Sequence, residues 1–276
     1  MVTIVRSTHA WDAERLSFFE VMPDQGEVEQ ECIVLMHGGG SGDNKEPSLP
    51  LAEDLAARGY RVLALDFTGS GESSGEWSKL TLDRRRDQAA SLIQGCLPAQ
   101  APLILIGFSM SGQTAADLAS RFGERVTRLV LCAPGVYSRT LRDTAFGDKS
   151  FPILAFHLPE LWADSPALDV LATFGGRTLL VLPEYEEEVP PGMAGLIEKS
   201  LRANPRVTTL RLEGAGHLLD QWLASHPMDR QAVISGFCDR LPQPGSGRLL
   251  KLRPLPSAPG STERGHAVRP DGPCGG

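Results

Sequence analysis

Short apolar runs alternate with segments of helical spacing along most of the chain. Six runs are rich in β-branched residues or leucine and are bounded by glycine, proline or charge: 32–36, 60–65, 103–106, 126–132, 178–182 and 207–212. Runs of this kind are typical of strands covered on both faces. Between them, apolar residues recur at helical spacing in 51–56, 89–93 and 115–119. Because strand and helix alternate, the pattern predicts an α/β fold, with a mostly parallel central sheet flanked by helices.

Three segments depart from this alternation. Residues 16–21 alternate loosely between apolar and polar, which predicts an antiparallel edge hairpin with residues near the start. Residues 139–174 form the longest insertion between strands and carry several aromatics, as is typical of a lid. From Pro242 onward the chain is rich in Pro, Gly, Ser and Arg without apolar periodicity, so we expect disorder there. The prediction is one domain over 1–241 and a tail over 242–276.

Composition and charge narrow the possible partners. Of the 276 residues, 41% are hydrophobic and 22% are charged, which allows a large core. The formal net charge of -7, without a cluster of Lys or Arg in the body of the chain, argues against a nucleic-acid partner and favours small molecules.

Cysteine spacing and the N-terminus indicate the compartment. Five widely spaced cysteines include no Cys-x-x-Cys pair, so we expect neither a disulfide framework nor a zinc site. The N-terminus lacks the pattern of a signal peptide, and no run approaches the roughly 20 apolar residues of a membrane span. These observations predict a cytoplasmic protein without a membrane span.

Two serines compete for the role of nucleophile in the run GFSMSGQ, residues 107–113. A nucleophile on a sharp strand-to-helix turn needs small residues two positions before and after it, because the helix starts almost against the strand. Ser109 has glycine and serine there, whereas Ser111 is followed by the bulky Gln113. We therefore predict Ser109 as the nucleophile and Ser111 as a small packing residue. The helix N-terminus would direct the N–H of Met110 toward a developing oxyanion.

This run resembles the nucleophile elbow of the α/β-hydrolase superfamily, Gly-x-Ser-x-Gly, with Ser111 at the last glycine. The stretch HGGG, residues 37–40, directly follows an apolar run and is similar to the oxyanion loop of that family. By this resemblance, the N–H of Gly39 is the second oxyanion donor beside Met110, and Gly40 is a near alternative.

A second loop also resembles the family pattern. The stretch DFTGSGES, residues 66–73, is similar to the Asp-x-x-Gly-x-Gly-x-Ser stretch of the superfamily. We expect it to be structural, with Asp66 and Ser73 hydrogen-bonding to nearby backbone.

The imidazole is assigned from the same resemblance. The stretch GAGH, residues 214–217, follows the last apolar run, where the family places its general base, which points to His217. The order serine, acid, histidine along the chain also fits this fold. His37 is a rival imidazole inside the predicted oxyanion loop, whereas the remaining histidines have no matching context.

The acid comes from a run of glutamates. The family typically has an Asp four residues before the proline of a Val-Pro pair, and Pro190 in that register selects Glu186. This chain departs from the family pattern here, because a glutamate is one methylene longer than an aspartate. Glu184 and Glu187 stay open as alternatives, and Glu188 is assigned with them to a charged surface run before the next helix.

The resemblance covers about residues 10–240 and implies a serine hydrolase that needs neither a metal nor an organic cofactor. Within the superfamily, the chain resembles the esterases related to lysophospholipases and serine aminopeptidases. We expect cleavage of a carboxylic ester or thioester of a small-molecule acyl substrate through an acyl-enzyme. The aromatics of the insertion, notably Phe151, Phe156 and Trp162, predict an apolar acyl or alcohol portion, unless they form the core of the insertion itself.

Other functions remain open at this point. Acyl transfer uses the same triad, and amide or peptide hydrolysis would call for an amine-binding acid in the insertion, where Glu160 and Asp164 are available. A ligand-binding protein that has lost turnover would keep the same fold. A dehalogenase is disfavoured because that chemistry uses a carboxylate at the elbow, and NAD binding because the first glycine loop lacks Gly-x-Gly-x-x-Gly.

Overall fold

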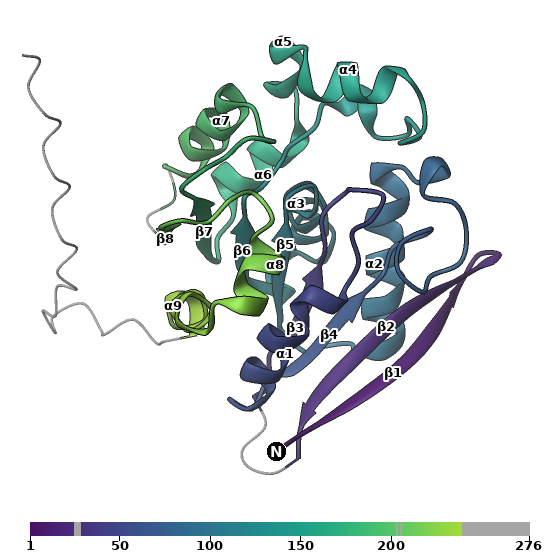
Figure 1. Cartoon of the computed structure of the whole chain (residues 1–276), viewed down its shortest axis with the longest axis vertical. Coiled ribbons are helices and arrows are strands. Elements are labelled where there is room, and N and C mark those ends of the chain that lie inside the picture. The colour runs from purple at the N-terminus through teal and green to yellow at the C-terminus, as the bar shows by residue number, and fades with distance from the viewer. Residues whose placement is uncertain (25–28, 203, 205, 239–276) are drawn as a thin grey trace, which may run out of the picture. The chain divides into compact units, whose positions relative to one another are not determined.

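The computed structural model describes residues 1–24, 29–202, 204 and 206–238. They form an eight-stranded sheet in the order β1-β2-β4-β3-β5-β6-β7-β8, with helices on both faces (Figure 1). The predicted α/β class is therefore confirmed. The tail predicted for 242–276 lies outside the described residues.

The strands reproduce the apolar runs of the sequence. Their bounds are β1 (Val2–Trp11), β2 (Glu14–Pro23), β3 (Cys32–Met36), β4 (Arg61–Leu65), β5 (Leu103–Phe108), β6 (Val126–Cys132), β7 (Arg177–Pro183) and β8 (Val207–Leu212). From β4 to β8 across the sheet all pairs are parallel, whereas β1 pairs antiparallel with β2, and β2 with β4. The predicted edge hairpin is thus present as β1 and β2. Every residue of β3 and β5 is buried, because helices cover both faces at the centre of the sheet.

Two apolar layers hold the helices against the sheet. One layer contains the apolar faces of α2 (Leu82–Cys96), α3 (Ser111–Phe122), α6 (Pro166–Thr173) and α7 (Pro191–Leu201). The other contains those of α1 (Leu49–Ala56), α8 (Leu219–Ser225) and α9 (Pro227–Cys238). Successive side chains of a strand point to opposite faces of the sheet. In β3, Val34 therefore belongs to the first layer, and Ile33 and Leu35 belong to the second.

The order of the central strands fixes where a ligand can bind. The chain leaves β3 to one side, to form β4, and then returns to the other side, to form β5. Met36 at the end of β3 is in register with Gly107 near the end of β5. The loops that follow these two strands therefore meet at the carboxyl edge of the sheet, at the switch point where α/β proteins bind ligands.

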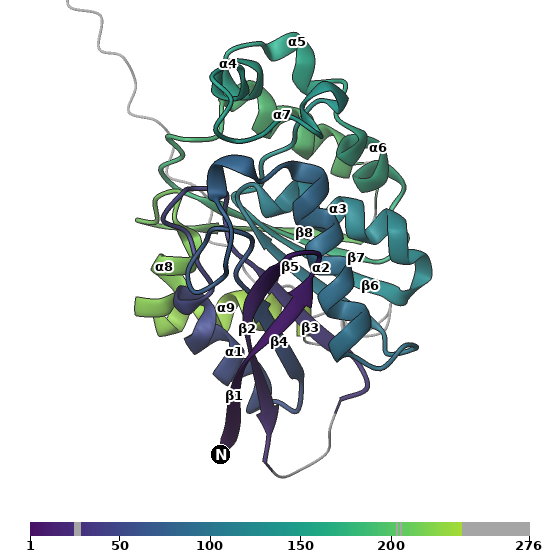
Figure 2. The same cartoon turned by 90° about the vertical axis from the view of Figure 1, so that its right-hand side faces the viewer.

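The segment between β6 and β7 has two parts. The 3-10 turn η4 (Arg139–Leu141), α4 (Ser150–Phe156) and α5 (Pro159–Trp162) come first, and α4 and α5 stand beyond the sheet at the top of both views (Figure 2). The second part is α6, whose Leu168 and Leu171 join the apolar layer on the sheet. The projecting part of the predicted insertion therefore precedes α6.

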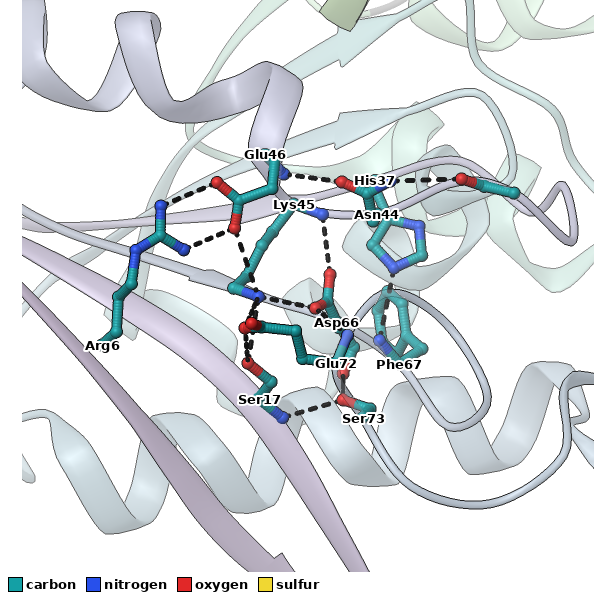
Figure 3. Close-up of polar contacts among 11 residues, drawn as sticks. Arg6, Ser17, His37, Asn44, Lys45, Glu46, Asp66, Phe67, Glu72 and Ser73 are labelled. Carbon is teal, nitrogen blue, oxygen red and sulfur yellow. Dashed lines mark hydrogen bonds and ion pairs between the residues drawn. The ribbon is translucent and has the colours of Figure 1, made fainter.

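A buried ion pair joins the loops after β3 and β4 (Figure 3). Lys45 and Asp66 are 1% and 0% exposed, and the Lys45 ammonium lies 2.6 Å from Oδ2 of Asp66. Lys45 also donates its backbone N–H to Oδ1 of Asp66 (2.7 Å) and its ammonium to Oγ of Ser17 on β2 (3.0 Å). Ser73 donates its hydroxyl to the Asp66 carbonyl at 2.7 Å, as expected from the sequence. Two loops and strand β2 are thus joined through one buried ion pair.

Replacing Lys45 tests how much the ion pair stabilises the fold. Lys45→Met leaves the Asp66 carboxylate buried without its cation, so we expect the free energy of unfolding to fall by about 3–5 kcal/mol. The double variant Lys45→Met/Asp66→Asn should recover part of this loss, because no charge then remains buried. Urea denaturation followed by circular dichroism measures both values.

Lys79→Met is the matched control for this prediction. The Lys79 side chain is 72% exposed and pairs with Glu76 at the surface, so its loss should cost no more than about 1 kcal/mol. Equal effects of the two lysine substitutions would contradict a structural role for the buried pair.

Candidate active site

Ser109 stands on the turn between β5 and α3, where the backbone is left-handed with a φ of 50°. This conformation costs a residue other than glycine roughly 1–3 kcal/mol. Its N–H donates to the carbonyl of Cys132 (2.9 Å), and its carbonyl accepts from Gly112 (2.8 Å). A Cβ at Gly107 would lie 2.3 Å from the carbonyl oxygen of Ser111, so strand and helix leave no room for a side chain there. The sharp turn predicted around Ser109 is present.

The structure brings together the three residues predicted as nucleophile, base and acid. Oγ of Ser109 lies 2.8 Å from Nε2 of His217. Nδ1 of the same ring lies 2.8 and 3.0 Å from the two carboxylate oxygens of Glu186. Oε1 of Glu186 also accepts the N–H groups of Glu188 and Val189, each at 2.9 Å. With the ring proton on Nδ1 donated to Glu186, Nε2 is free to accept the hydroxyl proton of Ser109.

The surrounding charges favour the ionised forms of this acid and base. Burial by itself lowers the pKa of His217, but the hydrogen bond and charge of Glu186 outweigh it, with help from Glu188 and Asp43, so the pKa is raised above its ordinary value. Burial acts to raise the pKa of Glu186, yet its hydrogen bonds from His217, Val189 and Glu188 leave it below the ordinary value. Glu186 is therefore a carboxylate at neutral pH, suited to stabilise an imidazolium.

The glycine loop after β3 lies against the start of α3. A Cβ at Gly39 would lie 2.5 Å from Sδ and Cε of Met110, so the two predicted oxyanion donors are close neighbours. The N–H of Gly40, the near alternative, donates to Oδ2 of Asp43 at 2.8 Å. Within the described residues, the N–H groups of Gly39 and Met110 donate to no protein acceptor. Gly39 is therefore the better placed of the two glycines to donate to a ligand.

A buried guanidinium ties the glycine loop to α3. Arg85 on α2 is 0% exposed, and its Nη2 donates to the carbonyl of His37 and to Oγ of Ser111, both at 2.7 Å. The Ser111 hydroxyl in turn donates to the His37 carbonyl at 2.6 Å. Burial lowers the pKa of Arg85 to about 9, so the side chain is still a cation at neutral pH. The serine at the position where the family has glycine thus makes a hydrogen bond that glycine could not make.

His37, the rival imidazole, has a structural position. Its Nδ1 donates to the carbonyl of Gly38 at 2.9 Å, and its Nε2 accepts the N–H of Phe67 at 3.3 Å. Burial lowers its pKa well below the ordinary value, and the charge of Arg85 adds to this. His37 is therefore a neutral ring with both nitrogens engaged.

A cavity of about 350 Å³ opens beside Ser109. His217, the glycine loop and aromatic side chains of the insertion line it, among them Phe151 and Phe156. Trp162 does not line it: the ring is 5% exposed and its Nε1 donates to the carbonyl of Ala155 inside the insertion. Of the three aromatics singled out in the sequence, two face the cavity and one supports the insertion from within.

The other acids considered in the sequence lie elsewhere. Glu184 accepts the N–H of Gly214 at 2.6 Å, and Glu187 is exposed. Glu160 and Asp164 do not line the cavity, and Asp164 instead faces Arg139 at 3.6 Å. Among the described residues, no cluster of three or more His, Cys, Asp or Glu could hold a metal ion. Over the same residues, none of the helices combines the length and apolar character that a membrane crossing requires.

Comparisons with known proteins agree with this architecture. A family model described as the alpha/beta hydrolase fold matches residues 31–160. The thioesterase domain from the curacin biosynthetic pathway superposes with a TM-score of 0.64 at 17% identity, over 84% of this chain and 99% of that domain. The chain has the α/β-hydrolase fold. The serine hydrolase CarC of carbazole degradation superposes similarly, with a TM-score of 0.61 at 19% identity, over 86% of this chain and 99% of that one.

Relatives of this chain by sequence are similar over shorter stretches. A 2-hydroxy-6-oxo-6-(2'-aminophenyl)hexa-2,4-dienoic acid hydrolase from Metapseudomonas resinovorans is 31% identical over 36% of this chain and 34% of its own length. A 2-hydroxy-6-oxononadienedioate/2-hydroxy-6-oxononatrienedioate hydrolase from Escherichia coli K12 is 32% identical over 40% of this chain and 38% of its own. The matched stretch therefore spans little more than a third of these relatives.

Several charged residues near the candidate site were missed in the sequence analysis. Oε2 of Glu188, assigned to a surface run, lies 3.5 Å from Nε2 of His217. Asp43 and Asp220 line the cavity. Asp43 follows Gly40 of the glycine loop by three positions, and Asp220 follows His217 by three positions; this closeness in sequence was the available signal. Nothing in the sequence distinguished Arg85, because it is the middle one of three consecutive arginines and such a run is typical of a solvent-exposed helix face.

Replacing Ser111 tests the buried network beneath the loop. Ser111→Ala removes one donor to the His37 carbonyl and one acceptor of Arg85, so we expect the free energy of unfolding to fall by about 1–3 kcal/mol. Ser120→Ala, at an exposed position of the same helix, should change it by no more than about 0.5 kcal/mol. Urea denaturation of the wild type and the two variants measures these changes. Equal unfolding midpoints for all three proteins would contradict a stabilising role of the network.

Proposed function

We propose that this chain is a serine hydrolase that cleaves a carboxylic ester or thioester through an acyl-enzyme intermediate. The observation that carries the proposal is the continuous row of hydrogen bonds from Ser109 through His217 to Glu186, at 2.8 Å for each link. A nucleophile, a base and an orienting acid within hydrogen-bond reach are the requirements for this chemistry.

Acylation begins when the Ser109 hydroxyl attacks the substrate carbonyl. Nε2 of His217 takes the hydroxyl proton and later delivers it to the leaving alcohol or thiol. Glu186 keeps the ring in the correct tautomer and stabilises the imidazolium that forms. The raised pKa of His217 reflects the same stabilisation in the resting protein.

The tetrahedral oxygen formed in this step is held by the N–H groups of Gly39 and Met110. Both lie beside Ser109, and Met110 precedes the first turn of α3, where backbone N–H groups carry partial positive charge. Loss of one donor of this kind costs about 3–4 kcal/mol of transition-state stabilisation. Water then attacks the acyl-enzyme with His217 as the base, and Ser109 is regenerated.

A second candidate reaction is hydrolysis of a carbon–carbon bond next to a ketone. It is favoured by the names of the sequence relatives, which are hydrolases of 2-hydroxy-6-oxo dienoic acids. Ser109 could attack a 6-oxo carbonyl in the same way as an ester carbonyl, with a carbon leaving group in place of an oxygen or sulfur. Parallel assays with p-nitrophenyl esters, acyl thioesters and a 2-hydroxy-6-oxo dienoate separate the two reactions by their products.

Covalent labelling tests the nucleophile directly. A fluorophosphonate probe should label the wild-type protein and Ser120→Ala, and should fail to label Ser109→Ala, because the Ser109 hydroxyl faces an imidazole that is itself held by a carboxylate. In-gel fluorescence with mass spectrometry of the labelled peptide provides the measurement. Label on Ser109→Ala at the wild-type level would remove Ser109 from the mechanism.

The pH profile tests the base and its acid together. The base acts as neutral imidazole, so kcat/KM should fall as the pH drops through the pKa of His217, which lies above the ordinary 6.5. Glu186→Gln removes the hydrogen bond and charge that raise this pKa, so the acid limb should move to lower pH. We also expect kcat to fall on the order of 10²–10⁴-fold, because the ring loses its orienting acid.

Glu187→Gln is the control for the pH profile, since Glu187 is an exposed residue of the same loop. It should keep both kcat and the position of the acid limb. An acid limb that stays in place in Glu186→Gln would show that another group sets the pKa of the base.

A further inference from the structure

The cavity beside Ser109 has three carboxylates in its wall and no lysine or arginine. Asp43, Glu188 and Asp220 all line it, and His217 is the one basic side chain among the described lining residues. Each carboxylate comes from a different segment: the loop after β3, the loop after β7 and the first turn of α8. The chain therefore gathers negative charge at the same place where it gathers the proposed catalytic groups.

Asp220 is a buried acid without a cationic partner. Its side chain is 7% exposed, and Oδ1 accepts the backbone N–H of the next residue, Gln221, at 2.9 Å. No ion pair with a lysine or arginine is formed by it among the described residues. Burial raises its pKa, and the charge of Asp43 adds to this. A buried carboxylate of this kind is costly unless it is protonated or paired with a cation, and a cationic ligand would favour its ionised form.

Glu188 brings a negative charge next to the reacting atoms. Its Oε2 lies 3.5 Å from Nε2 of His217, the nitrogen that faces Ser109. Asp43 also lines the cavity, and its Oδ2 accepts the N–H of Gly40. Arg85 lies outside the lining; it is buried, and its Nη2 donates to the His37 carbonyl and to Ser111.

Aromatic rings that are in contact with one another also line the cavity. The ring centroids of Trp77 and Phe146 lie 5.7 Å apart, and those of Phe146 and Phe151 4.8 Å apart. Tyr137 continues the group at 6.3 Å from both Phe151 and Phe156. Aromatic faces attract ammonium groups, more strongly where water is excluded, and cages of such rings are a common way to bind quaternary ammonium.

We propose that the substrate of this site carries an ammonium group within a few bonds of the carbonyl that Ser109 attacks. The aromatic rings and the three carboxylates both favour a cation there, whereas a substrate carboxylate would meet like charge at short range. The inference rests on the proposed serine hydrolase and names its substrate class. It also sets this chain apart from relatives that are named for dioate substrates.

Three butyryl thioesters that differ only at the end of the thiol arm test this charge preference. They are butyrylthiocholine, its neutral isostere S-(3,3-dimethylbutyl) thiobutyrate, and the thioester of 2-mercaptoethanesulfonate. We expect kcat/KM for the cationic thioester to exceed that for the neutral one by about 10-fold, equivalent to about 1.4 kcal/mol, and the anionic one to be slowest. A second pair of p-nitrophenyl esters, of 4-(trimethylammonio)butanoate and 5,5-dimethylhexanoate, places the cation on the acyl side instead.

Variants of the lining acids test which carboxylates cause the preference for the cationic substrate. Asp220→Asn and Glu188→Gln should each lower the ratio of cationic to neutral kcat/KM toward one, and Glu187→Gln should leave this ratio at its wild-type value. The ratio is measured within each variant, so a general loss of activity does not affect it. A wild-type ratio of one or less in both substrate series would overturn the proposal, even if the neutral esters are cleaved through Ser109.

Binding to an inactive variant separates this proposal from the proposed function. Choline and its neutral isostere 3,3-dimethylbutan-1-ol are titrated into Ser109→Ala by calorimetry, and choline should bind about 10-fold more tightly. If no ester is cleaved and no probe labels Ser109, the hydrolase proposal fails, while this comparison still decides the preference for a cation. Equal affinities of the two alcohols would overturn it.

Discussion

The left-handed backbone at Ser109 is the constraint around which the rest of the site is arranged. β5 ends at Phe108 and α3 begins at Ser111, so the chain must reverse within two residues. The turn is possible because Gly107 lets strand and helix approach closely, and because backbone hydrogen bonds from neighbouring segments hold the strained residue. As a result, the Ser109 hydroxyl lies at the carboxyl edge of the sheet, within reach of His217.

Buried polar groups position the loops that face this hydroxyl. Arg85 and Ser111 fix the carbonyl at the start of the glycine loop, and the pair of Lys45 and Asp66 fixes the end of the same loop. Apolar side chains of similar size would cost less to bury. The polar groups instead define hydrogen-bond positions, so the loop has one preferred path past Ser109. Rigid support of this kind is what an oxyanion site requires, because its donors act only when they point at the developing charge.

The cavity is lined by two unlike groups of side chains, aromatic rings and carboxylates. The rings contributed by η2 (Trp77–Lys79) and by the segment that includes α4 present polarisable faces, whereas the loops at the sheet edge present carboxylates. Two of these carboxylates, Glu188 and Asp43, act together with Glu186 to raise the pKa of His217. The electrostatics that would select a cationic substrate therefore also favour the protonated imidazole that forms during the proposed acylation.

Local sequence determined the strands, the helices and the serine turn of this protein. Buried strands and amphipathic helices follow from the periodicity of apolar residues, and the small residues around Ser109 are a local steric requirement, so both were predictable. Glu186 was selected by the register of the proline in Val189-Pro190 together with the family resemblance, and the structure places it beside His217. The tertiary structure alone decided the roles of Lys45, Arg85, Glu188 and Asp220. The physical reason is that a charged side chain in a helix or loop has no periodic signal, and whether it is solvated, paired or facing a cavity depends on which distant segments pack against it.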